Sequence, residues 1–184
     1  MELAFDTYEY PFGQIHVVMD EMGVRELILT SGQWDDYVAG HGEMKRDLAL
    51  CRNAVKELDE YFLGKRLEFT VPLSIEGTDF CKKVWQELQS IPFGETRSYA
   101  DIALAIGKPK ACRAVGQANR KNPIPIIIPC HRVIGKHGDL TGYCGTGHLE
   151  IKEYLLQMER SYQQKLVSKK IEPVQGHENR ESDK

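Results

Sequence analysis

The 184-residue sequence lacks long apolar runs and a recognisable export signal. No stretch approaches the ~18 consecutive apolar residues that a membrane-spanning helix needs, so the composition excludes a transmembrane helix. The first residues include Glu2 and Asp6, and they do not have the basic-then-apolar layout of a secretory signal. We therefore expect no membrane partner and a cytoplasmic location, or a nuclear one if the source is eukaryotic.

Cysteine is scarce, and its spacing argues against disulfides and metal sites. The odd number of cysteines leaves at least one thiol free, and no Cys-x-x-Cys pair occurs among them; they are Cys51, Cys81, Cys112, Cys130 and Cys144. The first 80 residues add only His16 and His41, too widely spaced from Cys51 for a zinc site. We expect reduced thiols, no bound metal and no other cofactor, with Cys51, Cys81 and Cys112 as buried core residues.

The charge of the chain is close to balanced overall but not along its length. The formal net charge is −3. Residues 1–80 carry nine more acidic than basic side chains, whereas residues 81–136 carry ten basic and three acidic ones. A basic segment is compatible with a solvated surface and with a polyanionic partner such as a nucleic acid. The motifs inside the segment have to decide between these two interpretations.

The first half of the chain has the pattern of a small sheet followed by a helix. Alternation of apolar and polar residues predicts strands over 14–19 and 24–29, joined as a hairpin. Apolar residues at three- and four-residue spacing predict an amphipathic helix over 44–63, and 67–73 is typical of another strand. The segment 74–78, with its glycine and a helix-capping residue, is the candidate domain boundary.

The second half is predicted to be helical. Helices are expected over 79–90, over 98–107 and over 109–122, and the last two resemble a helix-turn-helix. The second of these two helices places three polar side chains on one face beside two small ones: Arg113, Gln117 and Arg120 next to Ala114 and Gly116. Small residues let this face approach a surface closely. A structural helix pair with a solvated basic face is the alternative interpretation.

A thiol and an imidazole lie next to each other after this helix. The proline-bounded apolar run 124–128 is expected to be a buried extended segment that delivers Cys130 and His131 to its end. An imidazole within reach, directly or through one water, takes the proton of a thiol and leaves a nucleophilic thiolate. From these residues alone, a cysteine nucleophile acting on DNA and a cysteine hydrolase both remain open.

The last segments supply a flexible loop and a carboxylate. The glycine-rich run 135–147 is predicted to be a loop whose backbone approaches a ligand closely. A helix is expected over 148–160, where Glu159 lies at the edge of the apolar stripe and is a candidate to orient the imidazole of His131. From Ser161 onwards the polar chain is predicted to fray or to be disordered.

The sequence closely resembles the O6-alkylguanine-DNA alkyltransferases, also called methylated-DNA:protein-cysteine methyltransferases. The motifs that carry the resemblance are Pro129-Cys-His-Arg-Val133, Asn122-Pro-Ile-Pro, Ser98-Tyr99 and Arg113-Ala-Val-Gly116. The resemblance extends to about Arg160 and implies an α/β (α+β) fold. It implies a ribonuclease H-like sheet-and-helix domain over 1–76 and a helical DNA-binding and alkyl-acceptor domain over 77–162. The remaining residues, 163–184, lie outside the resemblance and are expected from their polar composition to be a flexible tail.

The resemblance also implies a reaction. The alkyl group of O6-alkylguanine in double-stranded DNA would be transferred directly and irreversibly to the thiol of Cys130, once per protein monomer. His131 would deprotonate Cys130 through water, with Glu159 orienting the imidazole. Tyr99 would help rotate the nucleotide out of the duplex and protonate the leaving guanine, and Arg113 would fill the gap in the base stack. Whether O4-alkylthymine is a second substrate is left open.

The other site positions follow from the same resemblance. Asn122 would tie the recognition helix to the active-site segment, and the face with Ala114 and Gly116 would lie in the minor groove of DNA. The backbone at Cys130 would line the base pocket together with Pro125, Val133, Tyr143 and Cys144.

The sequence departs from the family pattern beside this pocket. It has Gly145-Thr-Gly-His-Leu149 where two glycines and a leucine are usual, an apparent two-residue insertion. Cys144 takes a position often held by a small or hydroxyl residue, so the accepted alkyl size stays open. A non-enzymatic sensor of alkylated DNA is a further alternative, although relatives of that kind lack the cysteine that is present here.

Overall fold

The N-terminal half forms one four-stranded sheet with a helix along it. The computed structural model describes residues 2–42, 44–143 and 147–171. Strands β1 (Ala4–Tyr10), β2 (Gly13–Asp20) and β3 (Gly23–Ile28) form an antiparallel meander, and β4 (Lys45–Arg46) pairs in parallel with β1, which gives the order β3-β2-β1-β4. The predicted hairpin is confirmed as β2 and β3.

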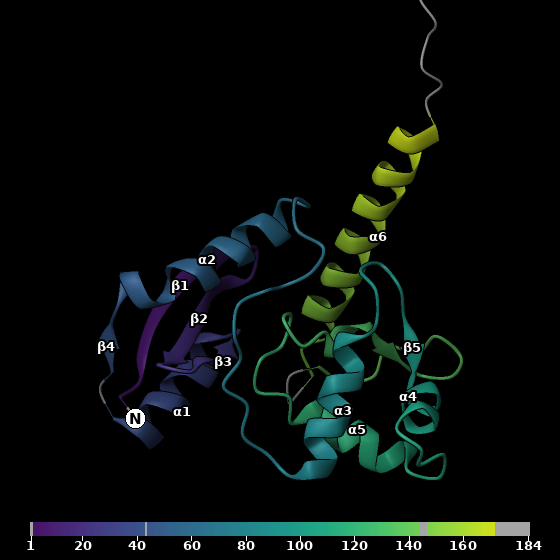
Figure 1. Ribbon diagram of the computed structural model, residues 1–184, viewed down its shortest axis with the longest axis horizontal. Coiled ribbons are helices and arrows are strands. Elements are labelled where there is room, and N and C mark those ends of the chain that lie inside the picture. Colours follow the sequence, from purple (N-terminus) through teal and green to yellow (C-terminus); the bar gives the residue numbers. More distant parts are fainter. Residues whose placement is uncertain (1, 43, 144–146, 172–184) are drawn as a thin grey trace, which may run out of the picture.

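Two helices accompany this sheet. Helix α1 (Ser31–His41) follows β3, and the longer α2 (Leu48–Phe62) packs against β1 and β2 (Figure 1). The expected start of the second helix at residue 44 is wrong, because the side chain of Asp47 accepts the backbone N–H groups of Ala49 and Leu50 and so caps the helix at Leu48. The sequence patterns did not predict β1, β4 or α1.

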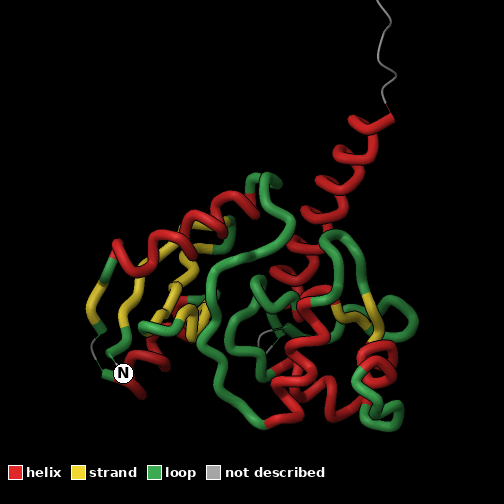
Figure 2. The backbone as a smooth tube through the Cα atoms, viewed as in Figure 1, coloured by secondary structure: helices red, strands yellow, loops and turns green. Residues whose placement is uncertain are grey.

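The segment 67–73 is not the strand that its composition suggests. It runs as an irregular connection between the two halves (Figure 2), and Leu73 makes only an isolated bridge to Val24. The backbone N–H groups of Thr70 and Val71 donate to the buried carboxylate of Glu57 instead of to a neighbouring strand. A side-chain acceptor on α2 thus takes the place of a β-ladder.

The C-terminal half consists of a cluster of short helices and one long helix. Helix α3 (Asp79–Gln89) contacts α5 (Cys112–Arg120), which packs in turn against α4 (Tyr99–Ala105). Ser98 and Asp101 form a complete capping box at the start of α4. The helix expected over 109–122 is shorter than predicted, because residues 108–111 form a turn before α5 begins.

The longest helix, α6 (Leu149–Ile171), corrects the prediction of disorder after Ser161. Two of its side chains bind the rest of the molecule beyond that point: Tyr162 donates to the carbonyl of Phe62 at 3.1 Å, and Gln163 donates to the carbonyl of Phe93 at 3.3 Å. The expected flexible tail is therefore helical as far as Ile171, and its later residues lie outside the described part. The C-terminal turns of α6 project away from the rest of the fold (Figure 1).

The buried apolar side chains of the two halves form a single continuous cluster that includes side chains from β2, α2, α3, α5 and α6. Within the described residues, no helix is long and apolar enough to cross a bilayer. The shared cluster leaves the two halves little freedom to separate, so groups from both can meet at one site.

Candidate active site and nucleic-acid interface

Cys130 begins a single 3-10 turn, Cys130–Arg132, that lies between α5 and α6. The preceding run was expected to be extended, but it turns at Ile126, which has a φ of 77°, a value that is strained for a β-branched residue. Two amides from α5 and its end hold this turn. Asn122 donates to the carbonyl of Ile128 at 2.7 Å, and Asn119 donates to the carbonyl of Cys130 at 3.4 Å.

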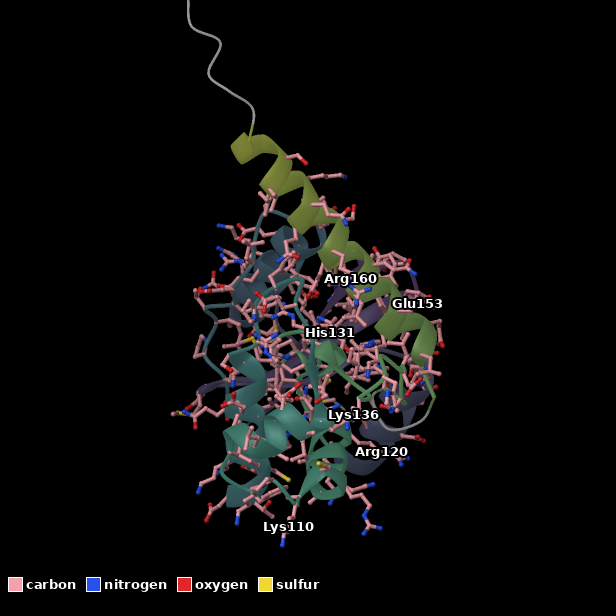
Figure 3. The ribbon with its side chains drawn as sticks, turned by 90° about the vertical axis from the view of Figure 1, so that its right-hand side faces the viewer. Lys110, Arg120, His131, Lys136, Glu153 and Arg160 are labelled. Carbon is pink, nitrogen blue, oxygen red and sulfur yellow. The ribbon has the colours of Figure 1, made fainter. Side chains whose placement is uncertain are left out.

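The imidazole of His131 is fully buried against a carboxylate. Its Nε2 lies 2.8 Å from Oε1 of Glu159 on α6. Arg132 binds the same carboxylate through Nε and Nη2, each at 2.9 Å, and its Nη1 donates to the carbonyl of Ile91. Figure 3 shows His131 in the interior, surrounded by other side chains, whereas Lys110 lies at the outer edge. The predicted pairing of His131 with Glu159 is present in the geometry.

These contacts fix the charge of both groups. Burial by itself opposes ionisation of Glu159, but the contacts with His131 and Arg132 outweigh it and hold the pKa of the carboxyl well below its usual range. Burial lowers the pKa of His131, and the positive charges of Arg132 and Lys152 lower it further, against the opposing pull of Glu159. We conclude that Glu159 is ionised and that His131 is a neutral imidazole at neutral pH.

A neutral His131 has one defined tautomer. Glu159 can only accept, so Nε2 of His131 must carry the proton and Nδ1 keeps its lone pair. Nδ1 is buried and has no hydrogen-bond partner among the described residues. The adjacent Cys130 is 2% exposed. The arrangement is a neutral base held by a carboxylate, and the next residue along the chain carries a shielded thiol.

An open cavity of about 640 Å³ lies between the exposed side of α5 and three residues that follow the 3-10 turn, Thr141, Gly142 and Gly147. The predicted DNA-contact residues Arg113, Gly116 and Tyr99 all line it. The hydroxyl of Tyr99 lies 2.7 Å from Oγ1 of Thr141. Burial and the nearby Cys130 raise the pKa of Tyr99, and the hydrogen bond with Thr141 acts against them. Tyr99 is therefore a protonated phenol that lines the cavity and lies close enough to Cys130 for the two groups to influence each other's charge.

The structure disperses some of the predicted pocket residues. Val133 and Tyr143 are buried close to the 3-10 turn, with the ring of Tyr143 edge-on to His131 at 6.4 Å. Pro125 lines a different groove of about 290 Å³, between β3, α1 and the end of α5. Cys144 and the start of the apparent insertion lie outside the described residues. Ala114 is exposed on α5, beside Arg113.

Two of the cysteines expected in the core are only half-buried. Cys81 lies on α3, and Cys112 opens α5 and lines the large cavity. Cys51 is fully buried as expected, and burial raises the pKa of its thiol to about 12. No cluster of metal ligands occurs in the ranges that the structure describes.

Sequence patterns missed several groups of this site. Tyr61 on α2 donates to Oε1 of Glu159 at 2.6 Å, and the backbone N–H of Gly94 donates to Oε2 at 3.0 Å. Lys152, fully buried on α6, donates to the carbonyls of Val133 and Thr141. The sequence does carry a signal for Lys152, because a lysine inside the apolar stripe of a helix is unusual. Tyr61 has the spacing of an ordinary core residue, so its sequence position held no such signal.

Comparison with known proteins assigns relatives to both halves. Residues 3–75 match the ribonuclease-like domain of 6-O-methylguanine DNA methyltransferase, and residues 79–161 match the DNA binding domain of 6-O-methylguanine DNA methyltransferase. The constitutive methylated-DNA–protein-cysteine methyltransferase of Bacillus subtilis is 49% identical over 164 residues, which cover 88% of this chain and 98% of the relative. The protein of that name from Methanosarcina barkeri is 46% identical over 159 residues, covering 86% and 98%.

Solved structures agree with these sequence matches. The O6-methylguanine methyltransferase of Mycobacterium tuberculosis superposes with a TM-score of 0.79 at 41% identity, over 87% of this chain and 94% of that chain. A structure of the protein from the same organism in complex with DNA superposes with a TM-score of 0.76 at 40% identity, over 88% and 94%. The similarity thus covers both the sheet half and the helical half of the chain.

Proposed function

The chain belongs to the 6-O-methylguanine DNA methyltransferase family, and from this premise we propose that Cys130 is the cysteine that receives the alkyl group. The protein binds DNA and acts as a methylated-DNA–protein-cysteine methyltransferase, which repairs alkylated DNA by alkyl transfer to cysteine. The observation that carries the assignment to Cys130 is the buried His131, whose Nε2 is fixed by Glu159 and whose Nδ1 remains a free base.

The proposed reaction is a direct displacement at carbon. Nδ1 of His131 takes the thiol proton of Cys130 through a water molecule, and the thiolate attacks the sp3 carbon attached to O6 of guanine. A carbon–sulfur bond forms as the carbon–O6 bond breaks, and Tyr99 donates a proton to the leaving guanine. The product is a stable thioether, so each molecule reacts once. The lesion is O6-alkylguanine in double-stranded DNA, and the protein acts as a monomer.

The exposed side of α5 is proposed to hold the DNA. The exposed cations Arg113 and Arg120 lie on it beside Ala114, and both line the large cavity. Cations on such a surface neutralise phosphates, while the small side chains permit close contact with the minor groove. Because a base inside a duplex is shielded from Cys130, the damaged nucleotide must rotate out, and Arg113 fills the vacated space. Asn122 keeps α5 in register with the reactive turn.

The two matched segments support a division of the chain into a scaffold domain over 1–76 and a reactive domain over 77–162. In this scheme Val133 and Tyr143, both buried beside the reactive turn, line the base pocket. Pro125 lines the separate groove between β3, α1 and the end of α5, so we do not assign it to the base pocket.

A labelled substrate tests the proposed function. Duplex DNA carrying O6-[methyl-¹⁴C]guanine is expected to leave one label per protein chain, located by peptide mass spectrometry on Cys130. Turnover of many substrate molecules per chain identifies a hydrolase instead. Binding without transfer identifies a sensor, so either result overturns the proposal.

We expect Arg113→Ala to slow the repair of duplex DNA far more than the reaction with the free base. Rotating a nucleotide out of the stack costs a few kcal/mol, and the inserted side chain of Arg113 offsets part of this cost. Without that side chain, the single-turnover rate at saturating duplex is expected to fall about 10- to 100-fold. The reaction with free O6-methylguanine, which needs no rotation, is expected to stay within about twofold.

Arg120→Ala is the matched control, because Arg120 is an exposed cation on the same helix and lines the same cavity. It is expected to weaken duplex binding in a salt-dependent way and to leave the rate at saturation unchanged. Equal losses on duplex and free base in Arg113→Ala contradict its role in the stack.

A further inference from the structure

A tyrosine from the sheet half reaches the base–carboxylate pair of the helical half. Tyr61 lies near the end of α2, where the helix reaches towards α6 (Figure 1), and its hydroxyl donates to Oε1 of Glu159 at 2.6 Å. The two residues are 98 positions apart in the sequence, and both are fully buried. This contact therefore depends on the docking of the two halves, and burial protects it from competition with water.

Tyr61 shares one carboxylate oxygen with the catalytic imidazole. Oε1 of Glu159 accepts from the hydroxyl of Tyr61, from Nε2 of His131 at 2.8 Å and from Nη2 of Arg132 at 2.9 Å. Oε2 accepts from the N–H of Gly94 and from Nε of Arg132. Of the donors to this carboxylate in the described part of the chain, Tyr61 alone comes from the sheet half. The hydrogen bond from Tyr61 therefore changes the negative charge on the same oxygen that binds His131.

The hydroxyl of Tyr61 is not needed for packing. The ring of Tyr61 packs among three phenylalanine rings, Phe62, Phe69 and Phe93, at centroid distances of 5.2 to 5.9 Å. A phenylalanine fills such a space equally well, and a buried hydroxyl is costly unless it is hydrogen-bonded. Burial and the charge of Glu159 raise the pKa of Tyr61 well above its ordinary value, so the phenol stays a proton donor across the working pH range.

We propose that Tyr61 is a positioning residue for alkyl transfer: its hydroxyl fixes Glu159 and moderates the negative charge that Oε1 presents to His131. This inference rests on the proposed function and deepens it, because it makes the sheet half a contributor to the reactive site. A donor on the carboxylate spreads its charge, which weakens its preference for a protonated imidazole. Tyr61 therefore helps to keep His131 a neutral base.

Several other charged or titratable groups face the same pair. Arg132 from the 3-10 turn and Lys152 from α6 oppose protonation of His131, and Cys130 and the edge-on ring of Tyr143 complete its surroundings. These groups stay in place when only the hydroxyl of Tyr61 is removed. If removal of the Tyr61 hydroxyl changes the proton affinity of His131, the change is therefore due to the lost hydrogen bond between Tyr61 and Glu159.

The test is the pH profile of single-turnover alkyl transfer from labelled O6-methylguanine duplex in full-length Tyr61→Phe. Without the hydroxyl, Oε1 attracts the imidazolium form more strongly, so the acidic limb of the profile moves to higher pH by about half to one unit. On that limb the rate falls about 3- to 10-fold, and on the alkaline plateau it stays within about twofold of the original protein. The ¹⁵N resonances of the His131 ring measure the same shift without reference to activity.

Tyr10→Phe provides a matched control, because Tyr10 is a buried tyrosine of the same half whose hydroxyl donates to the carbonyl of Leu29 at 2.6 Å, away from Glu159. It is expected to leave the acidic limb in place. Replacement of Tyr61 by 3-fluorotyrosine keeps the packing and makes the phenol a stronger donor, so it is expected to move the limb to lower pH. This second variant decides the question if Tyr61→Phe does not fold.

An unchanged profile, or a loss of rate by the same factor at every pH, overturns the role of Tyr61. Labelling of Cys130 in the original protein tests the proposed function separately. If that labelling occurs and Tyr61→Phe keeps the original limb, only the inference about Tyr61 fails. If Cys130 of the original protein is not labelled, the proposed function itself fails.

Discussion

Cys130→Ala is expected to abolish alkyl transfer completely while leaving the binding of duplex DNA intact. In the proposed reaction the thiol of Cys130 forms the new bond, so positioning and base catalysis by the other groups leave no residual transfer. Cys130 is 2% exposed, so its removal changes the DNA-facing surface little. Incubation with excess labelled O6-methylguanine duplex measures transfer, and a gel-shift titration measures binding.

Cys112→Ala is the informative control for this loss. Cys112 is the half-buried thiol that lines the large cavity and lies at the start of α5, so it is the described cysteine with the best access to DNA. The thiol of Cys112 donates to the carbonyl of Pro109, and among the described residues no histidine–carboxylate pair like that of His131 and Glu159 is hydrogen-bonded to it. We expect Cys112→Ala to take up one label per chain. Label on Cys112 in the Cys130→Ala protein contradicts the assignment.

Glu159→Gln is expected to lower both stability and activity strongly. The carboxylate accepts from Tyr61, Gly94, His131 and Arg132, and an amide cannot accept from all of them or neutralise Arg132. Removing one partner of a buried ion pair costs about 3–5 kcal/mol. Alkyl transfer is expected to fall in parallel, because His131 loses the acceptor that fixes its tautomer. Urea unfolding and single-turnover rates measure the two effects.

A surface ion pair supplies the matched comparison. Glu95 and Arg97 lie 2.9 Å apart with side chains 43% and 42% exposed, and such pairs contribute about 0–1 kcal/mol. Glu95→Gln is therefore expected to leave stability and activity nearly unchanged. A destabilisation by Glu159→Gln no larger than that by Glu95→Gln contradicts the central position of Glu159 in the fold.

Glu159→Gln is also expected to change how strongly the stability of the protein depends on acidic pH. The pKa of Glu159 is held well below its ordinary value of 4.5, so the stability that its ionisation supplies is fully present above that pH and is lost as the pH falls below it. Glu159→Gln lacks this contribution at every pH. Its unfolding free energy is therefore expected to fall less steeply than that of the original protein below pH 4.5.

The local elements were predictable where short-range signals decide them. The hairpin of β2 and β3, the capping box at Ser98 and the amphipathic faces of α2 and α3 follow from alternation, capping and helical spacing. The failures lie where a distant partner decides. Residues 67–73 bind a carboxylate on α2 instead of a strand, and α6 continues past Ser161 because Tyr162 and Gln163 find carbonyl partners in other segments.

The contact between His131 and Glu159 was also predictable, but the other groups around this pair were not. Cys130 and His131 are adjacent in the chain, and Glu159 stood out as a carboxylate at the edge of an apolar stripe. Tyr61 gave no comparable indication of a function, because a tyrosine in a core helix is common. Lys152 stood out only as a lysine inside an apolar stripe, which did not indicate the groups that it binds. Their contribution depends on which atoms they meet, and sequence spacing does not specify such contacts across 98 residues.

The sequence by itself determined the chemistry available to this protein: a thiol beside an imidazole, a basic segment around a helix pair, and the motifs of its family. Only the tertiary structure decided which form each group takes. Burial makes His131 neutral, the contacts with His131 and Arg132 keep Glu159 ionised, and the docking of α2 brings the Tyr61 hydroxyl to the same oxygen. Proton affinities depend on desolvation and on charges within a few ångströms, and these are properties of the folded arrangement.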